Sequence, residues 1–119
     1  MRKITDQLCV PANNEGPVVT AVDEEPDGVC YTYDVIKTDN TWLERIIFQH
    51  GPIYEVGVNG ITNEILLAIV IDRLRGFQAG GLRCRENAVA LTKLEEALMW
   101  LKKRTHERTV RGVEGTNEV

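Results

Sequence analysis

Residues 86–108 read ENAVALTKLEEALMWLKKRTHER, and this stretch decides the fold of the second half of the chain. Leucines recur within it at positions 91, 94, 98 and 101, in steps of three and four residues. That spacing lines one face of an α-helix, so it predicts a long helix from about Glu86 to about Arg108. Gly112 follows, and the polar sequence beyond it predicts a less regular tail.

A second, shorter helix is predicted upstream. Thr62 has the pattern of a helix N-cap. Ile61 precedes it and Leu66 lies four residues after Thr62, which is typical of a hydrophobic staple. We expect this helix to run to about Arg75 and to stop at Gly76. Residues 77–84 are then a glycine-rich connection, and the two helices form an antiparallel hairpin.

The shorter helix is apolar on nearly every side, because residues 65–71 form an uninterrupted apolar run. Such a helix has to be covered on more than one face. One partner helix and a small sheet leave part of it bare, so we favour coverage by another subunit, since large exposed apolar patches are rare. A helix buried entirely within its own chain is the alternative.

The first half of the chain has the pattern of strands joined by turns. β-Branched and alternating residues predict three strands, over 17–22, 29–36 and 41–48. The turns at Glu25–Gly28 and 38–40 are too short for crossover helices, which predicts an antiparallel meander. The predicted fold is therefore α+β and oligomeric. It is one domain over 1–119, with a small antiparallel sheet in 1–56, the antiparallel two-helix hairpin in 57–111 and a tail in 112–119.

Composition narrows the function classes. The chain has 119 residues, 43% of them hydrophobic and 27% charged, which is typical of a soluble globular protein. A membrane-spanning helix needs about 20 apolar residues, so no membrane partner is expected. Three separated cysteines without a CxxC pair predict neither a disulfide framework nor a metal site, and reduced thiols are typical of a cytoplasm.

The net charge of −4 hides an asymmetry. Residues 1–60 carry ten acidic and four basic side chains, whereas residues 61–119 carry eight acidic and ten basic ones. An acidic protein has little general attraction for a nucleic-acid polymer. Five of the basic residues fall within Lys102–Arg111, which suits a small phosphate-bearing ligand or a solvated helix end.

No set of residues indicates catalysis. No Ser-His-Asp order is present, and His50 and His106 are expected to be surface imidazoles. The acidic pairs within Asp23–Glu25 and at Glu95–Glu96 are expected to be solvated charges. We therefore expect a protein that is not an enzyme and holds no cofactor.

A binding role is better supported. Arg104 and Arg108 are four residues apart on the long helix, so they share a face on which guanidinium groups can bind phosphate or stack on a purine. Favourable charges at a helix C-terminus are the alternative explanation. Phe77, in the glycine-rich connection, could hold a flat base against an arginine, and Asn87 offers both donor and acceptor groups, with helix capping as its alternative. Trp100 is assigned to a core or an interface.

Residues 57–64, 84–101, 104–105 and 108–116 resemble a helical-hairpin domain that is widespread in phage proteins. This hairpin is shared by two kinds of phage anti-defence sponge, one for the cyclic oligonucleotide signals of CBASS immunity and one for glycocyclic ADP-ribose made by TIR-domain enzymes. The second kind is the first-described Thoeris anti-defence family. The N-terminal strand region resembles the Thoeris type.

The resemblance implies that the signal is bound intact at a subunit interface in the host cytoplasm. It assigns Phe77 and Arg104 to the two faces of the adenine and Asn87 to a polar contact; Arg108 is added from helix spacing as a phosphate partner. It further implies homodimers, and in some cases homohexamers with separate sites for cyclic di- or trinucleotides. The alternatives are a sponge for those CBASS nucleotides, an enzyme that degrades such signals with His106 as base, a nucleic-acid-binding accessory protein, and a structural phage subunit.

Overall fold

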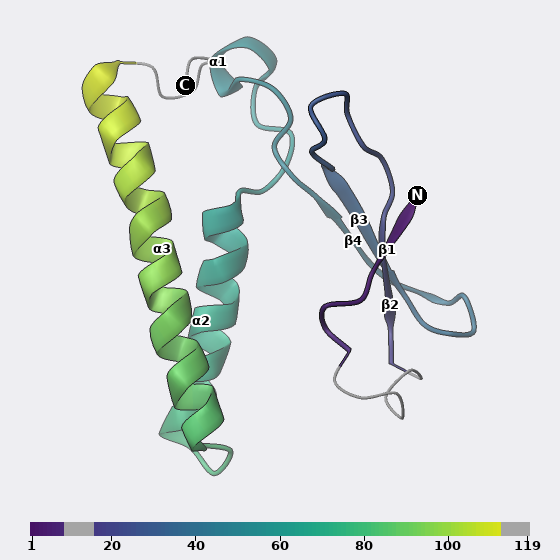
Figure 1. The fold of residues 1–119 in the computed structure, drawn as a ribbon, viewed down its shortest axis with the longest axis vertical. Helices are drawn as coiled ribbons and strands as arrows, with labels where there is room; N and C mark the ends of the chain where they lie inside the picture. The colour runs from purple at the N-terminus through teal and green to yellow at the C-terminus, as the bar shows by residue number, and fades with distance from the viewer. Residues whose placement is uncertain (9–15, 113–119) are drawn as a thin grey trace. The chain divides into compact units, whose positions relative to one another are not determined.

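A computed structural model describes residues 1–8 and 16–112 of the chain. Contacts divide the chain into two units, which we name the sheet unit, Met1–His50, and the hairpin unit, Gly51–Val119. Figure 1 shows strands in the first unit and helices in the second. The predicted α+β class is confirmed.

The sheet unit is a four-stranded antiparallel sheet in the order β1-β2-β3-β4. Its strands are β1 Arg2–Ile4, β2 Val18–Ala21, β3 Thr32–Ile36 and β4 Trp42–Ile47. The predicted meander is confirmed, but the prediction of three strands was wrong because β1 was missed. Its three residues are stabilised by pairing with β2, and a short edge strand leaves little pattern in its own sequence.

Two turns fix the register of the sheet. In the predicted Glu25–Gly28 turn, the backbone N–H of Gly28 donates to the carbonyl of Glu25 at 2.8 Å, and Gly28 has a φ of 85°. In the next turn Asn40 takes a φ of 68°, which asparagine tolerates better than most residues. The register shifts between Val35 and Ile36, so that they pair with Glu44 and Trp42 and leave Leu43 as a bulge.

The hairpin unit begins with a short helix that the sequence did not predict, α1 Ile53–Val56. It is followed by α2 Asn63–Ala79, whose N-cap is Thr62 as predicted. The Thr62 side chain accepts a hydrogen bond from the backbone N–H of Ile65 at 3.2 Å.

Helix α2 does not stop at Gly76 but continues to Ala79, so the predicted end was wrong. A glycine inside a helix costs only about 0.5–1 kcal/mol, which is too little to end one. Gln78 lies in the added turn, and its side-chain oxygen accepts a hydrogen bond from the backbone N–H of Cys84. Phe77 therefore lies on the last turn of a helix and not in a connection.

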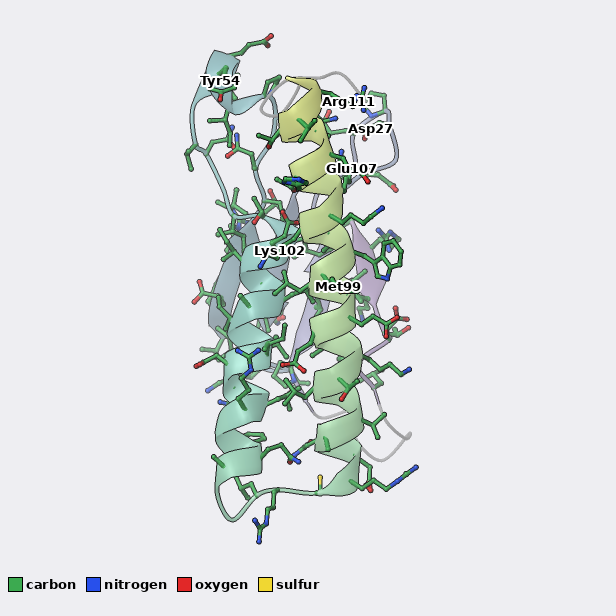
Figure 2. The ribbon with its side chains drawn as sticks, turned by 90° about the vertical axis from the view of Figure 1, so that its left-hand side faces the viewer. Asp27, Tyr54, Met99, Lys102, Glu107 and Arg111 are labelled. Carbon is green, nitrogen blue, oxygen red and sulfur yellow. The ribbon has the colours of Figure 1, made fainter. Side chains whose placement is uncertain are left out.

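Helix α3, Arg85–Arg111, starts and ends within a few residues of the prediction. Cys84 is its N-cap, and its last turn closes on Gly112, which has a φ of 77° and donates to the carbonyls of Arg108 and Thr109. Figures 1 and 2 both show α3 lying alongside α2 and continuing well past the first turn of α2.

The hairpin is held together along one stripe of α3. The side chains at 87, 91, 94, 98, 101, 105 and 108 are half-buried or buried, in alternating steps of four and three residues, as in a coiled coil. Ile71 of α2 is 1% exposed. This stripe includes all four leucines that predicted the helix.

Candidate functional site

Phe77 and Asn87 lie at the end of the hairpin where α2 turns into α3. Phe77 is in the last turn of α2 and Asn87 is in the first turn of α3, and both are half-buried. The structure thus brings these two predicted ligand residues to the same end of the hairpin.

Asn87 combines a structural contact with an open acceptor. Its Nδ2 donates to the carbonyl of Leu82 at 3.3 Å, and its backbone N–H donates to the Sγ of Cys84 at 3.4 Å. In the described part of the chain no group donates to its Oδ1. The N-cap of α3 is thus Cys84 and not Asn87, whose backbone N–H is the group that is capped, and the Asn87 side-chain oxygen remains able to accept from a ligand.

One residue near Phe77 was missed by the sequence analysis. The Arg73 guanidinium carbon lies 4.9 Å from the centre of the Phe77 ring, within cation–π range. The two residues are four apart, so they face each other only if the helix continues past Gly76. Because the helix was predicted to end at Gly76, the sequence did not predict this contact between Arg73 and Phe77.

Arg104 and Arg108 lie at the opposite end of α3. Arg104 is exposed, whereas Arg108 is 6% exposed and belongs to the buried stripe. Four-residue spacing therefore does not give them the same access to solvent. Glu107, on the same turns, forms an ion pair of 3.0 Å with Lys103. Figure 2 shows Glu107 and Arg111 on the part of α3 that extends past α2.

Within one chain the structure does not bring Phe77 and Arg104 together. Asn87 and Arg104 are 17 residues apart on one helix, which at 1.5 Å per residue amounts to about 26 Å along its axis. A purine ring cannot span that length. One hairpin thus carries half of the expected site at each end.

The hairpin leaves large apolar side chains exposed. Ile65 is 46% and Ile69 58% exposed on α2, and Trp100 is 58% exposed on α3. Trp100 is therefore not in the core of the described hairpin unit, and Lys103 lies over its ring at 5.5 Å. The hairpin unit itself thus leaves part of α2 uncovered, and coverage of that part by another subunit stays a prediction.

The sheet unit carries a second arginine laid over an aromatic ring. The Arg45 guanidinium carbon lies 5.0 Å from the Trp42 ring centre, and its Nε and Nη2 donate to the two carboxylate oxygens of Asp34 at 2.7 and 3.0 Å. The hydrogen bond from Arg45 lowers the pKa of the Asp34 carboxyl. This arginine already has its anionic partner.

The two histidines belong to different units. His50 is exposed and stacks on Tyr31 with ring centres 4.0 Å apart, and His106 is exposed on α3. Within residues 1–8 and 16–112, no cluster of three histidine, cysteine or acidic side chains is placed to hold a metal ion. None of the helices in this part of the chain has the length and hydropathy to cross a membrane.

Comparison with known proteins shows the family to which the hairpin belongs. The family model described as the Acb2/Tad1 hairpin domain matches residues 43–106. "Thoeris anti-defense 1" of Bacillus phage SBSphiJ7 is 62% identical over 76 residues, which are 64% of this chain and 54% of that protein. The chain thus spans about half the length of that curated relative. The resemblance drawn from the sequence is confirmed: the chain belongs to the Acb2/Tad1 hairpin-domain family.

Proposed function

We propose that this chain is a phage anti-defence sponge that acts in the host cell. It binds glycocyclic ADP-ribose between two of its copies and withholds it from the immune effector without cleaving it. The single observation that supports this most is the 62% identity to a protein named "Thoeris anti-defense 1". Binding alone suffices for this function, so no catalytic residue is needed.

The geometry of the hairpin favours a site shared by two copies. Phe77 and Asn87 lie at one end and Arg104 at the other, about 26 Å away along the helix. Two hairpins related by a two-fold axis, running in opposite directions, would place the Phe77 end of each against the Arg104 end of its partner. Such a pair has two equivalent sites.

The exposed apolar side chains of α2 support the same pairing. Ile65 and Ile69 lie four residues apart on one helix face and are largely exposed. Burial against a second copy would remove this surface from water. We propose a homodimer, able to assemble further into a hexamer, with its ligand sites where the copies meet.

Within each site we assign the purine to Phe77 and Arg104, and a polar contact to Asn87. A phenyl ring and a guanidinium plane can stack on the two faces of a flat base. Arg108 is proposed as a phosphate partner, although its side chain is only 6% exposed in the single chain. Arg104, which is exposed, is the more accessible of the two cations.

The matching family model, whose description joins two protein names, Acb2 and Tad1, is compatible with a second ligand class. In addition to glycocyclic ADP-ribose, we propose cyclic di- and trinucleotides of CBASS as ligands. They share the stacked purine and the phosphate groups that the proposed residues recognise. Calorimetry with each nucleotide separates the two classes.

One experiment separates a sponge from an enzyme. The protein is incubated with glycocyclic ADP-ribose, freed of unbound ligand, denatured by heat and analysed by mass spectrometry. A sponge returns intact ligand in a fixed ratio to protein. Degraded ligand, or no retained ligand, contradicts the proposal.

The Arg104→Ala variant tests the site. Loss of a charged, stacked contact should weaken binding by about 10- to 100-fold, because hydrogen bonds to charged groups contribute about 1.5–3 kcal/mol. Lys103→Ala is the matched control, since Lys103 is a neighbouring cation already paired with Glu107. Size-exclusion chromatography with light scattering should show the same oligomer for both variants. Equal affinities in calorimetry would refute the assignment of Arg104.

A further inference from the structure

Arg73 is a cation without an anionic partner in an otherwise apolar stripe of α2. It is exposed and lies four residues after Ile69 and four before Phe77. No carboxylate of the described residues forms an ion pair with it, and its one described interaction is with the Phe77 ring. Cation–π stacking uses the face of the guanidinium, so its N–H groups remain free to donate in its plane.

The other described arginine that lies over an aromatic ring shows what a purely structural pair looks like. Arg45 rests on Trp42 and also binds both oxygens of Asp34, so its charge is compensated inside the sheet unit. Arg75, two residues from Arg73 on the same helix, is likewise compensated, because it binds Glu95 of α3 at 2.8 Å. Arg73 has no counterpart of Asp34 or Glu95.

We infer that Arg73 is a further ligand-binding residue and that it donates to a phosphate group of the nucleotide whose purine stacks at Phe77. This inference rests on the proposed function. A ring with a guanidinium on one face still offers its other face or its edge to a base. The planar N–H groups of arginine match two phosphate oxygens at once, so one side-chain pair would recognise both the flat and the anionic part of the ligand.

At Gly76, beside the Arg73–Phe77 pair, no other part of the described chain packs against the helix surface. Gly76 lies three residues after Arg73 and next to Phe77, and a Cβ added there would meet no atom within 4 Å. Packing inside the described chain therefore does not demand a glycine, although glycine lowers helix stability. A ligand can approach the backbone closely at this point.

The test is calorimetric titration of glycocyclic ADP-ribose into the full chain and into two matched variants, Arg73→Ala and Arg75→Ala. Both remove one positive charge from α2, but Arg75 already has a partner. We expect Arg73→Ala to weaken binding by about tenfold or more, as for loss of a charge-assisted contact, and Arg75→Ala to stay within about twofold. The affinity of Arg73→Ala should also fall less steeply with added salt, because fewer charges contact the ligand.

Folding is followed by circular dichroism, and Arg73→Gln, which keeps most of the alkyl chain, replaces Arg73→Ala if that variant loses helix. Equal affinity of the Arg73 and Arg75 variants would overturn this inference and leave the proposed function intact. Failure of the unmodified chain to bind glycocyclic ADP-ribose or any cyclic nucleotide would overturn the proposed function, and this inference with it.

Discussion

The two units of the chain use their polar side chains differently. In the sheet unit, acidic side chains bind the unit itself: Asp23 accepts from the backbone N–H groups of Tyr31 and Thr32, and Asp34 binds Arg45. In the hairpin unit, Arg73 and Arg104 face solvent and have no carboxylate partner among the described residues. The hairpin packs instead along its leucine stripe.

This difference explains why the candidate site lies on the hairpin. Packing by apolar side chains leaves the cations of a helix free, whereas a small sheet needs its polar groups for its own turns. Of the two described arginines that lie over an aromatic ring, the one in the hairpin unit, Arg73, therefore keeps its charge available to a dissolved anionic ligand, whereas Arg45 in the sheet unit is already bound to Asp34. Trp42 lies in the sheet unit and Trp100 in the hairpin unit, so the fluorescence of a variant that keeps only one of them follows one unit.

The largest expected effect tests what holds the hairpin. Ile71→Ala should destabilise it by about 2–5 kcal/mol, because the side chain is almost fully buried and leaves a cavity. Ile69→Ala is the matched control on the same helix, where the side chain is 58% exposed. Urea unfolding at low protein concentration, followed by helical circular dichroism, gives both values. If both variants lose the same stability, the burial of Ile71 is not what holds the hairpin together.

The next effect tests where the ligand binds. Phe77→Ala should weaken nucleotide binding by about 1–3 kcal/mol, the usual contribution of an aromatic ring stacked on a base. Trp42→Ala removes a comparable arginine-stacked ring from the sheet unit and should leave the affinity unchanged. A similar loss of affinity in both variants, measured by calorimetry, would mean that residues of the sheet unit also take part in binding.

The sequence predicted most of the fold because its strongest patterns are local. The leucine spacing predicted α3, Thr62 predicted the start of α2, and the proline and glycine of the Glu25–Gly28 turn predicted the reversal between β2 and β3. The end of α2 was missed because glycine disfavours a helix only weakly. Strand β1 was missed because its pairing with β2 depends on residues far apart in the sequence.

The candidate site was harder to predict than the fold. Phe77, Asn87 and Arg104 were singled out by residue type and by the resemblance, and the predicted helix of residues 86–108 already implied that Asn87 and Arg104 lie near its opposite ends. The burial of Arg108 was not predicted, because its four-residue spacing to Arg104 indicated that both arginines share one exposed face. The Arg73–Phe77 pair required the correct helix end.

A smaller effect should have opposite signs in the two units. Gly76→Ala should stabilise the hairpin by about 0.4–1 kcal/mol, since the helical backbone accepts alanine and a Cβ meets nothing there. Gly28→Ala should destabilise the sheet, because Gly28 has a φ of 85°. Thermal unfolding of variants that keep only Trp100 or only Trp42 measures the change in stability of the hairpin unit and of the sheet unit, respectively. Destabilisation by Gly76→Ala would show that its helical environment is more crowded than the structure indicates.

The smallest effect is the acid sensitivity of the sheet unit. A hydrogen bond from the Cys30 thiol, together with those from two backbone N–H groups, lowers the pKa of the exposed Asp23 carboxyl below its ordinary value of 3.8. The folded state thus favours the charged form, so this contribution to stability is present above pH 3.8 and is lost as pH falls through the lower folded value. In a Trp100→Phe background, Trp42 fluorescence should therefore report that the sheet becomes less stable below about pH 4.

The Asp23→Asn variant keeps the acceptor oxygen but cannot titrate, so it should reduce the dependence of the sheet's stability on pH. It should not abolish it, because the pKa values of Asp34 and Asp39 are also lowered. Asp72→Asn, in the hairpin unit, is the control; an unchanged acid profile in Asp23→Asn would mean that this carboxylate does not hold the sheet.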